Sequence, residues 1–111
     1  MRYICAQPGE LYFCWQIDVM IHSFIEAGVE QEKIDIIFSD FKDDIIYYFE
    51  LKDKYPKVNF HIYADTRTDI KYISSIRPHL LKKHFQKFWW KYRGTFLYHD
   101  ADIVLTRPLD L

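Results

Sequence analysis

Residues 95–105 read TFLYHDADIVL, and the fold is most clearly indicated by this stretch. Thr95 to Tyr98 has the apolar and aromatic character of a strand. Asp100 and Asp102 follow that strand directly, so both carboxylates can approach one point beyond its end. Carboxylate oxygens suit Mg²⁺ or Mn²⁺, with water and substrate phosphates completing the coordination. The stretch therefore predicts a divalent-cation site at the end of a strand.

Three further strands are predicted upstream. Arg2 to Ala6 is a β-compatible run that ends at the turn signal Pro8-Gly9. Asp35 to Phe38 has a short apolar strand centre, and Val58 to Tyr63 alternates in a way that predicts one face more buried than the other.

Two helices are predicted between these strands. Apolar residues recur at three- and four-residue steps from Leu11 to Gly28, which is typical of an amphipathic helix. Its predicted buried stripe consists of Cys14, Ile17, Ile21, Phe24 and Ile25. A second helix is predicted after a cap at Ser39 or Asp40 and before Pro56. Its predicted apolar side consists of Ile45, Ile46 and Phe49.

A third helix is predicted from Pro78, which suits a first helical turn, to Gly94. Its predicted apolar face consists of Leu81, Phe85, Phe88 and Tyr92. Basic residues also recur along this helix, and we expect them to form a solvated face. They are Lys82, Lys83, His84, Lys87 and Lys91.

Alternating strands and helices predict an α/β fold, a Rossmann-like α/β/α layer with a mostly parallel sheet. Such sheets bind ligands beyond the carboxyl ends of their strands. Three segments are predicted to meet there, namely residues 6–8, 64–66 and 99–102.

Composition narrows the class of protein. The 111 residues are 50% hydrophobic and 19% aromatic, which fits a single packed domain. A net charge of -1 gives no basic field for a nucleic-acid partner. No apolar stretch reaches the roughly 20 residues of a membrane span. Cys5 and Cys14 are too few for a disulfide framework, so we expect reduced thiols and a cytoplasmic location.

Residues 96–110, FLYHDADIVLTRPLD, resemble the Asp-x-Asp region of glycosyltransferases with the GT-A fold. In that family a buried strand leads into the two aspartates, and an apolar turn and a Pro-Leu-Asp-like segment follow. The segment Ile76-Arg77-Pro78 also resembles the family's basic residue and the helix before that strand. The resemblance implies the nucleotide-sugar-binding half of such an enzyme, with UDP as the expected nucleotide.

The resemblance also implies roles for single residues. Asp102 would be a direct ligand of Mn²⁺ or Mg²⁺, and Asp100 would contact the metal or the ribose. Ala6 and Gln7 would line the nucleotide pocket, and Asp65 would face the base or the ribose. Arg77 would approach the diphosphate.

Known members of the family continue well beyond the Asp-x-Asp motif, where they contribute a further metal ligand, the acceptor pocket and the catalytic carboxylate. We therefore expect residues 1–111 to be a single nucleotide-sugar-binding domain that is truncated after the motif and does not transfer sugar alone. A second copy or another chain would complete the fold, with Trp89-Trp90 as a candidate contact.

Other interpretations stay open. The run Asp100 to Val104 also fits a phosphatase of the haloacid-dehalogenase type, with Asp100 as nucleophile, although that motif opens its fold and here it comes late. A non-catalytic remnant or interaction module is a third alternative. Acidic residues also occur in plain turns, which is an alternative for Asp65 and for the Asp-x-Asp pair. Arg77 is also compatible with a surface position or an ion pair at the start of its helix, and His99 with a packed or solvated histidine.

Overall fold

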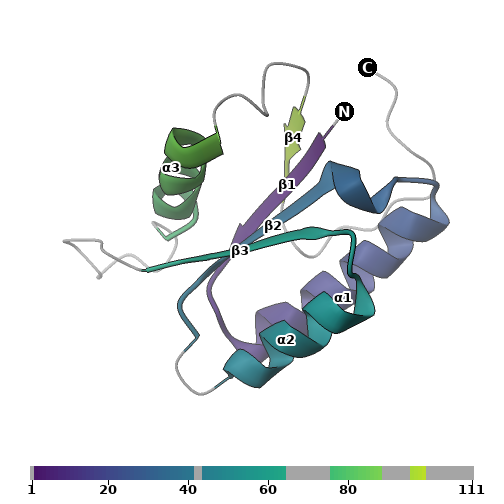
Figure 1. Ribbon diagram of the computed structural model, residues 1–111, viewed down its shortest axis with the longest axis horizontal. Coiled ribbons are helices and arrows are strands. Elements are labelled where there is room, and N and C mark those ends of the chain that lie inside the picture. The colour runs from purple at the N-terminus through teal and green to yellow at the C-terminus, as the bar shows by residue number, and fades with distance from the viewer. Residues whose placement is uncertain (1, 42–43, 65–75, 89–95, 100–111) are drawn as a thin grey trace.

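The computed structural model describes residues 2–41, 44–64, 76–88 and 96–99 (Figure 1). Four parallel strands form one sheet in the order β3-β2-β1-β4. The strands are β1 (Arg2–Gln7), β2 (Ile34–Ser39), β3 (Asn59–Tyr63) and β4 (Phe96–Tyr98). The helices are α1 (Leu11–Glu26), the short 3₁₀ turn η1 (Gln31–Lys33), α2 (Ile45–Lys54) and α3 (Ile76–Phe88).

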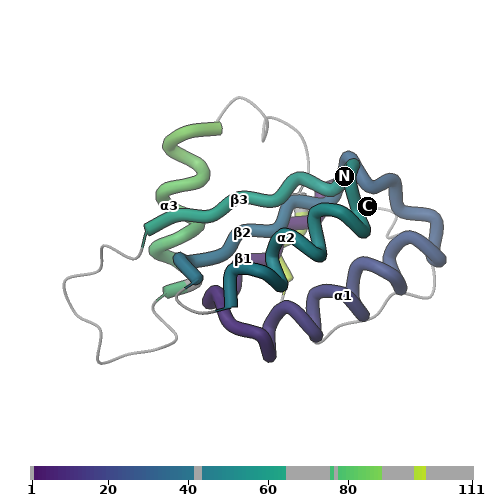
Figure 2. Tube along the Cα trace, turned by 60° about the horizontal axis from the view of Figure 1, so that its bottom comes forward, coloured from purple at the N-terminus to yellow at the C-terminus, as the bar shows by residue number. Residues whose placement is uncertain are grey.

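The sheet lies between two helical layers. Helices α1 and α2 lie side by side on one face and α3 covers the other (Figure 2). Side chains that alternate along β1 therefore enter two different cores: Tyr3 and Cys5 pack toward α1, and Ile4 and Ala6 pack toward α3. This arrangement confirms the predicted α/β/α layers and parallel sheet.

Helix α1 follows its predicted pattern. Cys14, Ile17, Ile21 and Phe24 are buried, together with Met20. After the helix, Gly28 has a φ of 95°, and the N–H of Val29 donates to the carbonyl of Phe24 at 3.0 Å. A glycine in this left-handed conformation ends many helices because it carries no Cβ.

The predicted buried side of α2 is wrong. Ile45, Ile46 and Phe49 are exposed, whereas Tyr48 and Leu51 are buried. Tyr48 packs edge-on against Phe38 of β2 and Phe60 of β3, with ring centroids 6.1 and 6.0 Å away. The five residues 45–49 are all apolar or aromatic, so their spacing alone could not select the face that packs.

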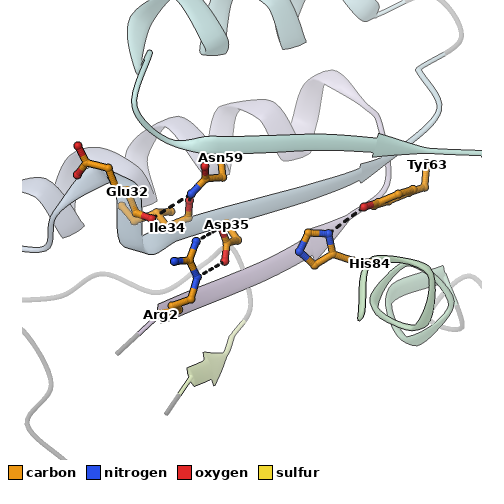
Figure 3. Close-up of polar contacts among 7 residues, drawn as sticks. All are labelled: Arg2, Glu32, Ile34, Asp35, Asn59, Tyr63 and His84. Atoms are coloured by element: carbon orange, nitrogen blue, oxygen red, sulfur yellow. Dashed lines mark hydrogen bonds and ion pairs between the residues drawn. The ribbon is translucent and has the colours of Figure 1, made fainter. Parts of the chain in front are cut away.

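The predicted face of α3 is confirmed in part. The helix begins at Ile76, two residues before Pro78, and its buried residues are Ile76, Leu80 and His84. The predicted Leu81 and Phe85 are half-buried and pack against the same core, and Phe88 is half-buried. The expected solvated face fails at His84, which is fully buried because its Nδ1 lies 2.9 Å from the Tyr63 hydroxyl (Figure 3).

Strand β3 is half-buried at all five positions, so the predicted difference between its faces is absent. It is an edge strand, covered by α2 on one side and α3 on the other. No helix in the described part of the chain is long and apolar enough to cross a membrane.

Candidate donor-binding edge

The order of the strands indicates where a ligand of this kind of sheet would bind. The chain runs from β1 outward through β2 to β3, then crosses back to place β4 on the other side of β1. Ligands of open α/β sheets bind at the carboxyl ends of the strands where the order reverses in this way. The reversal here falls between β1 and β4, where Tyr98 at the end of β4 pairs with Ile4 of β1.

In the connection from β1 to α1, residues 8–10, the backbone N–H groups of Gly9 and Glu10 donate hydrogen bonds to other groups of the protein. The N–H of Gly9 donates to Ser39 Oγ at 2.9 Å, and the N–H of Glu10 donates to the Pro8 carbonyl at 3.0 Å. At the start of α1, the N–H of Leu11 donates to Asp44 Oδ2 at 3.1 Å. Three consecutive N–H groups at this edge of the sheet therefore already have acceptors.

The same connection requires a glycine. A Cβ added to Gly9 would overlap the carbonyl oxygen of Ser39 and lie 3.0 Å from the backbone of Asp40. The backbones after β1 and after β2 are therefore in close contact, and no larger residue fits between them.

Ala6 and Gln7 are both buried at the end of β1. The Gln7 amide donates to Cys5 Sγ at 3.6 Å, so this side chain turns toward the core. Both side chains are therefore packed inside the protein.

His99 follows β4 directly and is anchored by contacts of two kinds. Its N–H donates to the Ile4 carbonyl at 3.0 Å, and its buried ring lies 5.1 Å from the ring of Phe24. These contacts fix the backbone immediately before Asp100. In the described part of the chain, His99 is a packed residue of the α1 core.

The remaining predicted site residues lie outside this description. Asp65, Asp100 and Asp102 are not among the described residues, and neither is the side chain of Arg77, the second residue of α3. Among the residues that the structure describes, no three His, Cys, Asp or Glu side chains gather as metal ligands.

Ser39 and Asp44 are the contributors that sequence reasoning missed. The predicted cap of α2 at Ser39 or Asp40 is wrong, since Ser39 ends β2 and Asp44 is the residue before α2. Asp44 is of a residue type that often caps the helix that follows it, here α2. Its carboxylate instead accepts the first N–H of the neighbouring α1. Its negative charge also affects Cys14 in α1. The pKa of the Cys14 thiol is raised to about 12, mainly by burial and additionally by the nearby Asp44 carboxylate.

Two solved structures are similar to this chain over almost its whole length. The mannosyltransferase PcManGT from Pyrobaculum calidifontis, solved with GDP-Man and Mn²⁺, matches 91% of the chain with a TM-score of 0.52 and 14% identity. S. aureus TarS 1–349 matches 92% with a TM-score of 0.51 and 15% identity. The chain spans 27% and 28% of those two structures. No protein-family model and no curated protein matches the sequence.

The chain therefore shares the fold of these two structures, a GT-A-like fold.

Proposed function

We propose that this chain is the nucleotide-sugar-binding part of a glycosyltransferase and that it binds its donor together with Mn²⁺ or Mg²⁺. The observation that carries this proposal is the reversal of strand order between β1 and β4. This reversal lies between β1, which leads into residues 8–10, and β4, which the sequence continues through His99 into the Asp-x-Asp motif. The likeness to a mannosyltransferase solved with a nucleotide sugar and Mn²⁺ supports the same assignment.

Occupied backbone donors support the need for a cation. Many α/β proteins bind phosphates at the N-terminus of the helix after the first strand. Here the N–H groups of Gly9, Glu10 and Leu11 already donate, and the acceptor at Leu11 is the carboxylate of Asp44. A diphosphate arriving at that point would meet a negative charge instead of free donors. A divalent cation between the diphosphate and the carboxylates after β4 supplies the missing positive charge.

The proposed roles follow from the resemblance of residues 96–110 to the Asp-x-Asp region. Asp102 is the direct metal ligand and Asp100 contacts the metal or the ribose. Ala6 and Gln7 line the nucleotide pocket. Asp65 faces the base or the ribose, and Arg77 approaches the diphosphate. When bound, the cation would stabilise the nucleoside diphosphate as a leaving group.

Calorimetry with UDP tests the proposal. Weak binding is expected with Mn²⁺ or Mg²⁺ and none with EDTA, because the carboxylates and the diphosphate repel each other when no cation lies between them. Equal binding with and without the cation would contradict the proposal. Hydrolysis of a generic phosphate ester would instead favour the phosphatase interpretation.

We also propose that the chain is cytoplasmic and associates with a second copy. Helix α1 exposes large apolar side chains, namely Leu11, Tyr12, Trp15 and Val19. Asp18 on the same helix is paired within the chain, with Lys54 at 2.9 Å. Large exposed apolar side chains gathered on one helix favour contact with a second copy, and the Trp89-Trp90 segment is a second candidate contact.

A further inference from the structure

Two side chains from the second βα unit hold the connection between β1 and α1. Ser39 is the last residue of β2, and its buried Oγ accepts the N–H of Gly9 at 2.9 Å. Asp44 precedes α2, and its Oδ2 accepts the N–H of Leu11 at 3.1 Å. The bonded residues are 30 and 33 positions apart in the sequence, so both bonds are tertiary. We call these two bonds the loop clasp.

The clasp supplies what the connection lacks locally. Glu10, at the N-cap position of α1, makes no side-chain cap hydrogen bond, and the first turn of α1 contains no acidic residue. The first N–H groups of a helix need acceptors from outside the helix. Gly9 is also conformationally permissive, so without Ser39 and Asp44 the connection would have more accessible arrangements.

We propose that Ser39 and Asp44 are positioning residues that hold residues 8–10 in the arrangement that binds the nucleotide. This role rests on the proposed function, because it assigns the connection to the donor pocket. When a site is competent for only part of the time, its apparent affinity falls by that fraction. The clasp raises nucleotide affinity by keeping the competent arrangement populated.

Ser39 and Asp44 are not proposed cation ligands. They belong to the βα unit formed by β2 and α2, whereas the two proposed ligands follow β4 in the sequence. Loss of the clasp is therefore expected to weaken nucleotide binding and to leave cation binding unchanged. A residue needed only for general stability would not divide the two affinities in this way.

Ser39→Ala tests the role, with Ser39→Thr as the variant that keeps the hydroxyl. Ser23→Ala is the matched control, because it removes a hydroxyl that bonds the Met20 carbonyl at 2.8 Å elsewhere in α1. We expect Ser39→Ala to weaken UDP binding at saturating Mn²⁺ by about tenfold, since it leaves a buried N–H without its acceptor. Ser39→Thr and Ser23→Ala are expected to stay near the parent, and Mn²⁺ affinity without nucleotide is expected to change less than about twofold in all three.

Asp44 is tested in the same way. Asp44→Ala and Asp44→Asn both remove the negative charge, so their difference reports the hydrogen bond alone. Asp44→Ala is expected to bind UDP more weakly than Asp44→Asn, because only the amide oxygen can still accept the Leu11 N–H. Asp53→Asn, an exposed acid on α2, is the control.

Unchanged UDP affinity in Ser39→Ala would overturn the proposal, and so would a parallel loss of UDP and Mn²⁺ affinity. Amide hydrogen exchange separates this failure from failure of the proposed function. If the parent binds no UDP with Mn²⁺ and Gly9 exchanges faster in Ser39→Ala than in Ser23→Ala, the clasp serves the fold alone, and both the donor assignment and the positioning role are wrong.

Discussion

Arg2 and Asp35 form a two-point ion pair at the amino ends of β1 and β2. Arg2 Nε and Nη2 donate to the two carboxylate oxygens of Asp35 at 2.9 and 2.8 Å (Figure 3). The Asp35 side chain is 1% exposed and that of Arg2 is 21% exposed. This pair lies at the amino ends of the strands, whereas the Ser39–Gly9 contact lies at their carboxyl ends. A substitution in the ion pair can therefore change the stability of the fold without touching the proposed ligand site.

Asp35→Asn is expected to destabilise the fold by about 3 kcal/mol, because it leaves the guanidinium partly buried without its charged partner. Urea unfolding measures this change, and Asp53→Asn is the exposed control. Replacing both partners, with Arg2→Met and Asp35→Leu, is expected to recover much of the loss. A cost below about 1 kcal/mol for Asp35→Asn would mean that the ion pair contributes no more than a surface pair.

Gly9→Ala is expected to cost roughly 1–3 kcal/mol, since the added methyl group would overlap the Ser39 carbonyl. Gly28→Ala is the matched comparison, with a cost of about 1–2 kcal/mol from its left-handed backbone conformation. Both variants lower stability in urea, but only Gly9→Ala is expected to weaken UDP binding at a temperature where both are folded. Equal UDP affinities would remove residues 8–10 from the donor pocket.

Cys14 is expected to be chemically inert in the native protein. Its pKa is raised to about 12 from 9.0, so the reactive thiolate at pH 8 is about 1,000-fold scarcer than in the unfolded chain. Alkylation by iodoacetamide, followed at Cys14 by mass spectrometry, should be slow until urea unfolds the protein. The neutral thiol's contribution to stability is complete below pH 9 and is lost as the pH rises toward 12. Fast native alkylation at pH 8 would contradict this assignment.

Self-association through α1 is tested by light scattering after size exclusion. We expect a dimer at micromolar concentration, and Trp15→Ser is expected to shift it toward the monomer because Trp15 is 75% exposed. A Trp89→Ser variant tests the second proposed contact. A parent protein that stays monomeric across this range would contradict the association.

Sequence reasoning succeeded where local pattern and packing agree. The apolar stripe of α1 and the alternation of strands with helices predicted the layers, because one helical face and parallel crossovers leave few other arrangements. It failed where several faces were equally apolar, as at residues 45–49 of α2.

Polar residues were the harder part to predict, because their partners are distant in the sequence. His84 belongs to a run of basic residues, and its burial is favoured by the Tyr63 hydroxyl from β3, whose position the sequence pattern does not reveal. Ser39 and Asp44 are residue types common in turns. The N–H groups that they accept belong to residues 30 and 33 positions away in the sequence. The periodicity of hydrophobic residues along one sequence does not reveal contacts between residues so far apart.

The proposed function depends on cation-dependent nucleotide binding through Asp102. The most direct measurement is a calorimetric titration of UDP in Mn²⁺, repeated in EDTA and with Asp102→Asn, with Asp53→Asn as the control. We predict weak binding by the parent and by Asp53→Asn in Mn²⁺, no binding in EDTA, and an affinity at least about tenfold lower for Asp102→Asn, since a metal ligand is lost. Asp102→Asn binding UDP and Mn²⁺ as tightly as the parent would contradict the account.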